Sequence, residues 1–148
     1  MVTLEQFRYC PTHSTHPPFC YDFHYVKPGM VAIFGDNGSG KSTLAQLMAG
    51  WYPDFLPGEI TGTGTLLGTP IGRLPLNEQS ATIQLVQQSP YLQLSGCTFS
   101  VEEEVAFGPE NLCLAEKEIM ARIDAALALT ECQPLRHRHP ATLSGGET

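Results

Sequence analysis

A glycine-rich loop at residues 35–42 carries the residues best suited to chemistry. Its sequence, Gly-Asp-Asn-Gly-Ser-Gly-Lys-Ser, matches the pattern G-x-x-x-x-G-K-[ST] at every fixed position. Glycines let backbone N–H groups approach phosphate oxygens closely, and the Lys41 ammonium would add a charge on the β- and γ-phosphates. The Ser42 hydroxyl would ligate Mg²⁺. The loop therefore predicts a nucleotide phosphate-binding site, with contacts from Gly35, Asp36, Asn37, Gly38, Ser39, Gly40, Lys41, Ser42 and Thr43.

Such a loop needs a strand before it and a helix after it to aim its N–H groups at a phosphate. Residues 30–34, Met-Val-Ala-Ile-Phe, have the length and composition of a buried strand. After the loop, Leu44, Leu47 and Met48 recur at helical spacing, and Gly50 is a suitable C-terminal stop. The alternative, a glycine-rich turn with a surface lysine, leaves this flanking pattern unexplained.

Composition and charge exclude several classes of function. The chain has 148 residues, enough for one domain with a core, and its 42% hydrophobic and 16% charged content is typical of globular proteins. A net charge of −7 provides no basic surface for nucleic acid or anionic lipid. No apolar run approaches a membrane span, the start lacks signal-peptide features, and the five scattered cysteines suit reduced thiols. We expect a cytoplasmic protein that reaches a membrane only through a partner.

Strands and turns are predicted on either side of the loop and its helix. Residues 19–26 predict a strand, and residues 58–71 predict a β-hairpin with glycine turns. Residues 81–87 predict a second core strand, which Pro90 would end. Ahead of the first strand lies a loop with four residues of zinc-ligand type, Cys10, His13, His16 and Cys20. The prolines and the unusual spacing of that loop favour solvated side chains over a metal site.

The pattern becomes helical from residue 93 onward. Residues 100–103, Ser-Val-Glu-Glu, form a capping box ahead of a helix that Gly108-Pro109 would close. Residues 112–129 predict a second helix with one apolar face. The chain therefore divides into an α/β phosphate-binding core, residues 1–92, and a helical subdomain, residues 93–148.

Three motifs together resemble the nucleotide-binding subunits of ABC transporters. They are the phosphate loop, Gln88-Ser-Pro90 and, at the C-terminal end, Leu143-Ser-Gly-Gly-Glu147. The stretch 100–112, Ser-Val-Glu-Glu-Glu-Val-Ala-Phe-Gly-Pro-Glu-Asn-Leu, and Arg136-His-Arg138 are similar to the energy-coupling factor branch, which takes up cobalt, nickel or vitamins. The resemblance covers nearly the whole chain.

This resemblance implies a fold, an activity and partners. The fold is a P-loop NTPase core of the ABC type with a helical subdomain. The cofactors are ATP and Mg²⁺, and ATP hydrolysis drives uptake of a small nutrient or metal ion. The partners are a membrane-spanning transporter subunit and a second ATPase subunit, which would place the protein at the inner face of the cell membrane. The alternatives are a soluble ABC ATPase without a transport role and a nucleotide-binding remnant without turnover.

The resemblance also implies roles for residues outside the phosphate loop. Tyr9 corresponds to the aromatic residue that stacks on adenine, although a core tyrosine on a strand fits the sequence equally well. Gln88 corresponds to the switch glutamine near Mg²⁺ and near the membrane subunit, so that Ser42 and Gln88 are the candidate metal ligands.

A second glycine motif is the family's signature, which closes over the γ-phosphate held by the opposite subunit. Glycine N–H groups and a hydroxyl at a helix start would form this second anion site. Glu147 stands where the family usually has Gln, and Ser144-x-x-Glu147 is also a plain capping box. The residues carried over are Ser144, Gly145, Gly146 and Glu147.

Part of the family's catalytic set has no counterpart in the sequence. After the signature, the family has an apolar strand ending in Asp, a Glu that polarises the attacking water, and a switch His. None of the four aspartates, at positions 22, 36, 54 and 124, ends such a strand. We therefore expect a chain that lacks the C-terminal part of the sheet, with an unpaired apolar edge beside the phosphate-loop strand and no general base.

Overall fold

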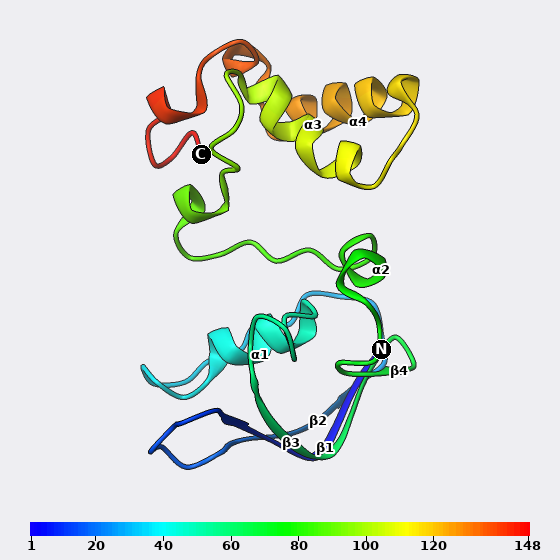
Figure 1. The fold of residues 1–148 in the computed structure, drawn as a ribbon, viewed down its shortest axis with the longest axis vertical. Helices are drawn as coiled ribbons and strands as arrows, with labels where there is room; N and C mark the ends of the chain where they lie inside the picture. The colour runs from blue at the N-terminus through cyan, green and yellow to red at the C-terminus, as the bar shows by residue number, and fades with distance from the viewer. The chain divides into compact units, whose positions relative to one another are not determined.

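A computed structural model describes residues 1–148, apart from the side chain of Leu76. Its contacts divide the chain into two units, Met1–Leu85 and Val86–Thr148. The first unit holds an antiparallel sheet and the helix that follows the phosphate loop, and the second is built from helices (Figure 1).

The sheet of the first unit has four strands. They are β1 (Val2–Pro11), β2 (Phe19–Tyr25), β3 (Gly58–Leu66) and β4 (Thr69–Pro70), in the order β2-β1-β3-β4 with every neighbour antiparallel. The structure confirms the strand predicted after the proline-rich loop. It also confirms the hairpin, which β3 and β4 form around a turn at residues 67 and 68.

An irregularity in β1 decides which of its side chains face the core. The register against both neighbours shifts between Leu4 and Phe7, where Gln6 has a φ of 45°. In an undisturbed strand, residues three apart point to opposite faces. Because of the shift, Leu4 and Phe7 are both buried, and Tyr9 follows them on the same face.

The helix α1 (Lys41–Met48) packs its apolar side chains on this face. Leu44 and Leu47 join the buried residues of β1 in one hydrophobic cluster, as the helical spacing predicts. The short helix α2 (Leu76–Ser80) supplies Gln79, whose buried side-chain amide donates to the carbonyl of Met48 at 2.6 Å. Gln79 therefore satisfies one of the free carbonyls at the end of α1.

Two predicted core strands are absent from the structure. Residues 30–34 have no regular secondary structure, and Met30 and Phe34 are 99% and 90% exposed. Residues 83–87 are likewise irregular, and Val86 is 86% exposed. A buried strand needs a neighbour on which to place its backbone hydrogen bonds, and no described strand pairs with either segment. Apolar content alone does not supply that neighbour.

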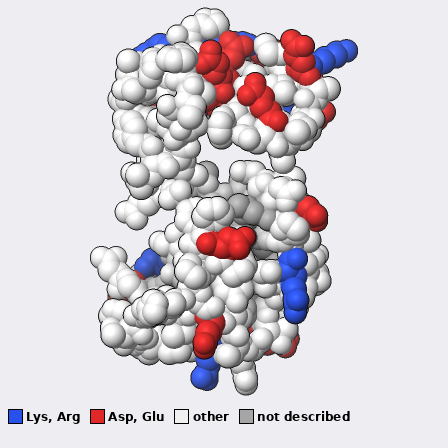
Figure 2. Space-filling model, in the orientation of Figure 1, with Lys and Arg blue, Asp and Glu red and all other residues white. Residues whose placement is uncertain are grey.

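The second unit is held together by two helices, α3 (Val101–Asn111) and α4 (Glu116–Leu129). Short 3-10 turns flank them: η1 (Pro90–Gln93), η2 (Gln133–Leu135) and η3 (Pro140–Thr142). The core of the unit consists of Val101, Ala106, Ile123, Leu127 and Leu143. Acidic side chains gather on the face of this unit seen in Figure 2.

The predicted capping box of α3 is confirmed, whereas its predicted end is wrong. The Ser100 hydroxyl accepts from the Glu103 N–H at 3.2 Å, and the Glu103 carboxylate accepts from the Phe99 N–H at 2.7 Å. The helix continues through Gly108-Pro109 to Asn111, and α4 begins at Glu116 rather than at residue 112. Pro109 removes only its own N–H from the ladder, so the last turn still forms.

Two glycines with similar backbone angles allow a matched test of the β1 irregularity. Gly62 and Gly68 have φ values of 81° and 89°. A Cβ at Gly62 would lie 2.2 Å from the backbone oxygen of Gln6, whereas nothing lies within 4 Å at Gly68. Gly68→Ala should lower the free energy of unfolding by about 1–2 kcal/mol, from the backbone angle alone. Gly62→Ala should lower it by about 1–3 kcal/mol more, because it also overlaps β1.

Urea unfolding followed by the fluorescence of Trp51 measures both losses. Equal losses in the two variants would show that β1 moves away from β3 without resistance, contrary to the packing described above.

A phosphate loop and a signature loop

The phosphate loop ends in a helix whose first N–H groups are free. Gly38 and Gly40 take the left-handed conformation, with φ values of 83° and 92°, and α1 begins at the next residue, Lys41. The N-cap, Gly40, offers no side chain to the helix. Within the described chain, the N–H groups of residues 41–43 have no acceptor, and the first helical bond runs from the Leu44 N–H to the Gly40 carbonyl at 2.8 Å. Free N–H groups at the positive end of a helix form an anion site.

The Lys41 side chain folds back over the loop. Its ammonium donates to the carbonyls of Gly35 and Asp36, both at 2.7 Å, and approaches the Ser39 hydroxyl at 3.4 Å. Those acceptors are neutral, so a phosphate oxygen would compete for the ammonium with a full charge. Ser42, the next residue in the chain, is exposed. Lysine, hydroxyl and free N–H groups therefore lie together on one short segment.

Two aromatic residues of β2, which the sequence analysis did not single out, hold the end of this loop. The Tyr21 hydroxyl donates to the Gly40 carbonyl at 2.8 Å. Burial raises the pKa of Tyr21 to about 12, so the phenol keeps the proton that it donates. A Cβ at Gly40 would lie 2.6 Å from both the Phe19 ring and the Tyr21 hydroxyl, so only glycine fits there. The alternation of aromatic residues at 19, 21 and 23 was the available signal.

A cavity of about 740 Å³ opens beside the loop within the first unit. Gly35, Ser39 and Lys41 line one part of it, and apolar residues of β2 and of the irregular segment 31–34 line most of the rest. A mostly apolar wall is typical of an unfilled protein interior rather than of a phosphate site. The phosphate contacts predicted from the sequence therefore remain those of the loop and do not include this cavity.

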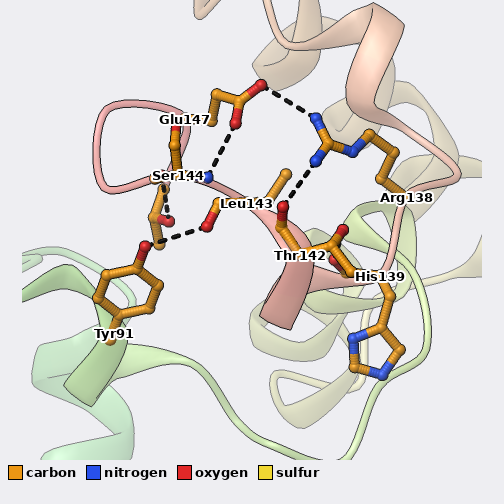
Figure 3. Close-up of polar contacts among 8 residues, drawn as sticks. Tyr91, Arg138, His139, Thr142, Leu143, Ser144 and Glu147 are labelled. Atoms are coloured by element: carbon orange, nitrogen blue, oxygen red, sulfur yellow. Dashed lines mark hydrogen bonds and ion pairs between the residues drawn. The ribbon is translucent and has the colours of Figure 1, made fainter.

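The signature loop in the second unit is braced by an ion pair and by hydrogen bonds (Figure 3). Arg138 contacts the Glu147 carboxylate at 3.0 Å and donates to the Thr142 carbonyl at 2.6 Å. The other Glu147 oxygen accepts from the Ser144 N–H at 2.8 Å, which closes the predicted capping box. The charge that Glu147 adds is therefore paired with Arg138 rather than left free beside a phosphate.

The two glycines of this loop have no internal hydrogen-bond partners. In the described chain, no acceptor is bonded to the N–H of Gly145 or Gly146, and both residues are exposed. The turn around them closes through the Glu147 N–H, which donates to the Ser144 carbonyl at 2.9 Å. A fixed turn with free N–H groups is suited to binding an anion.

The position of Tyr9 favours the core alternative over adenine stacking. Its side chain is fully buried in the cluster beneath α1, and its ring contacts Tyr52 edge-on. Its hydroxyl donates to the Pro57 carbonyl at 3.0 Å and approaches the Leu56 carbonyl at 3.3 Å. No face of the ring is left for a base. The shift in β1 turned this residue inward, and the sequence pattern did not reveal that shift.

The candidate metal ligands lie in different parts of the chain. Gln88 is exposed and belongs to the second unit, whereas Ser42 belongs to the first, so their pairing on Mg²⁺ remains a prediction. Among the described side chains, no three His, Cys, Asp or Glu residues are grouped to hold a metal ion. The described side chains include those of Cys10, Cys20 and the two histidines between them.

The bracing of the signature loop predicts a pH dependence. Hydrogen bonds from the Ser144 N–H and hydroxyl, together with the charge of Arg138, lower the pKa of Glu147. The folded-state pKa is the lower one, so the stabilisation is present above the unfolded-state pKa and is lost as pH falls through the folded-state pKa. In an NMR titration, the Ser144 amide should shift with a midpoint below that of an ordinary glutamate.

Arg138→Gln should raise this midpoint only in part, because the hydrogen bonds from Ser144 are the larger cause. An ordinary or elevated midpoint in the unmodified chain would contradict the bracing.

Known proteins resemble this chain over most of its length. A sequence profile described as ABC transporter matches residues 21–148. The energy-coupling factor transporter ATP-binding protein EcfA of Methanosarcina acetivorans is 38% identical over 148 residues, covering 99% of this chain and 52% of that protein. The corresponding EcfA1 protein of Levilactobacillus brevis is 42% identical over 117 residues, covering 79% of this chain and 39% of the relative.

A solved structure also shares the fold. It is cbiO1 of Clostridium perfringens, described as part of the ABC transporter complex cbiONQ, with a TM-score of 0.77 and 29% identity over 99% of this chain and 56% of that chain. The chain thus spans about half the length of these full-coverage relatives. None of the helices that the structure describes is both long enough and apolar enough to cross a bilayer. The matched profile and the shared fold show that this chain belongs to the ATP-binding proteins of the ABC transporter family.

Proposed function

We propose that the chain binds Mg·ATP through residues 35–43. The observation that carries this proposal is the run of unpartnered N–H groups at the start of α1, with the Lys41 ammonium over the same segment. Phosphate oxygens would accept from the N–H groups, and Lys41 would leave its carbonyl acceptors to contact the β- and γ-phosphates. The Ser42 hydroxyl would be the ligand that this segment offers to Mg²⁺.

We further propose that this binding serves an importer of the energy-coupling factor class. Relatives named as energy-coupling factor ATP-binding proteins and a neighbour from the cbiONQ complex support this class. The chain would act with a membrane-spanning subunit and a second ATPase subunit, at the inner face of the membrane. Residues 144–147 would bind the γ-phosphate held by the second subunit, and Gln88 would contact Mg²⁺ and the attacking water. The cargo would be a small nutrient or a metal ion.

Removing the Lys41 ammonium tests the phosphate site. Lys41→Ala should weaken Mg·ATP binding about tenfold to hundredfold, because a hydrogen bond to a charged group contributes about 1.5–3 kcal/mol. Isothermal titration of the purified chain measures the affinity. Lys117→Ala, which removes an exposed lysine from α4, is the matched control and should bind like the unmodified chain. An unchanged affinity in the Lys41 variant would end the assignment of the phosphate loop.

Binding without turnover is expected for residues 1–148 by themselves. Hydrolysis needs a residue that orients water and ligands that hold Mg²⁺ in line, and the sequence has no counterpart of the family's Asp and Glu after the signature. Phosphate release from the purified chain should stay at the level of the buffer. Steady release that Lys41→Ala abolishes would show that other residues of this chain perform the chemistry.

A further inference from the structure

A tyrosine side chain joins the segment of Gln88 to the signature loop. Tyr91 lies in η1, three residues after Gln88, and its hydroxyl donates to the Leu143 carbonyl at 3.0 Å (Figure 3). The next residue along the chain is Ser144, where the signature turn begins. A Cβ at Gly145 would lie 3.9 Å from the same hydroxyl. Tyr91 therefore lies against the turn and bonds to the carbonyl that precedes it.

The carbonyl that Tyr91 holds belongs to an anchored residue. Leu143 is buried in the core formed by α3 and α4, and its N–H donates to the Pro140 carbonyl at 3.1 Å. Beyond Leu143, residues 144–146 are exposed, and the loop is held by hydrogen bonds within itself and by the ion pair with Arg138. The tyrosine hydroxyl therefore acts at the junction between the fixed core and the exposed turn.

The far end of the same segment is fastened to α3. The Glu104 carboxylate accepts from the Ser95 N–H at 2.6 Å and from the Ser95 and Thr98 hydroxyls at 2.8 and 2.5 Å. Between this fastening and Gln88, the Tyr91 hydroxyl donates to the carbonyl that precedes the signature turn. A displacement that begins at Gln88 would therefore pass through Tyr91 before the fastened end absorbs it.

We propose that Tyr91 is a positioning residue that couples the Gln88 segment to the signature loop. The proposal rests on the proposed roles of Gln88 at Mg²⁺ and of residues 144–147 at the γ-phosphate. When the Gln88 segment is in place, the Tyr91 hydroxyl holds the Leu143 carbonyl and fixes the direction of the free glycine N–H groups. When the segment moves, the loop loses this restraint and its affinity for an anion falls.

Removing only the hydroxyl tests the restraint. Tyr91→Phe should make hydrogen exchange about threefold to tenfold faster at the bonded amides of Ser144 and Glu147, because one net hydrogen bond of the closed turn is lost. Exchange at the core positions Ile123 and Leu127 should stay unchanged. Tyr25→Phe, in the other unit, is the matched control because no hydrogen bond of the described structure involves its hydroxyl. Unchanged exchange at Ser144 and Glu147 would overturn the proposal.

A double-mutant cycle separates coupling from local stability. Pro90 stiffens the segment at the start of η1, so Pro90→Ala loosens it without touching the signature loop. Pro90→Ala should speed exchange at Ser144 in the unmodified chain but add little in the Tyr91→Phe background. Pro109→Ala in α3 is the matched control and should leave Ser144 unchanged. Equal, additive effects of Pro90→Ala in both backgrounds would show that Tyr91 does not transmit the displacement.

These measurements use the chain without nucleotide, so they stand apart from the proposed function. Failure of Lys41→Ala to weaken Mg·ATP would remove the nucleotide role while leaving the coupling measurable. If the effects of Pro90→Ala and Tyr91→Phe were additive while Mg·ATP still bound, the proposed coupling would be wrong and the proposed nucleotide site would stand.

Discussion

The place where β1 changes register supports the whole of the first unit. The shift between Leu4 and Phe7 lets three side chains of one strand face the same side, and Gly62 leaves room for it on the neighbouring strand. Leu44 and Leu47 of α1 pack against those three side chains. Because α1 begins directly at the phosphate loop, the direction in which its free N–H groups point depends on this packing. The functional segment is exposed, but its direction is set by buried packing.

The two glycine loops share a way of staying rigid while remaining open. In each, a tyrosine hydroxyl bonds to a backbone carbonyl at the edge of the loop: Tyr21 to Gly40 and Tyr91 to Leu143. Restraint through a carbonyl leaves the N–H groups unoccupied, which is the condition for receiving an anion. A serine or aspartate cap would fix the loop by bonding those same N–H groups and would close the site. A tyrosine from another segment can donate to the carbonyl and leave the N–H groups of the loop accessible.

Sequence reasoning succeeded where the signal was local and failed where a distant partner was required. The start of α1, the β3–β4 hairpin and the Ser100 capping box depend on residues within one or two turns of each other. Residues 30–34 and 81–87 are apolar enough for core strands, but pairing needs a neighbouring strand that their own sequence does not specify. Tyr9 is buried because of a register shift that leaves no signal in the sequence. The role of Tyr21 was missed because its partner is a backbone carbonyl, which every residue has and which no residue type reveals.

The pairing of Arg138 with Glu147 also makes the effect of a substitution at one of these positions depend on the residue at the other. A family member with Gln at the fifth signature position can cap Ser144 through an amide oxygen and needs no counter-charge. In this chain, loss of Arg138 first would leave an uncompensated carboxylate next to the proposed γ-phosphate contact. Glu147→Gln first would leave Arg138 still bonded to the Thr142 carbonyl, with a neutral loop beside it. The need for the arginine as a counter-charge therefore depends on the acid at position 147 and disappears when an amide replaces that acid.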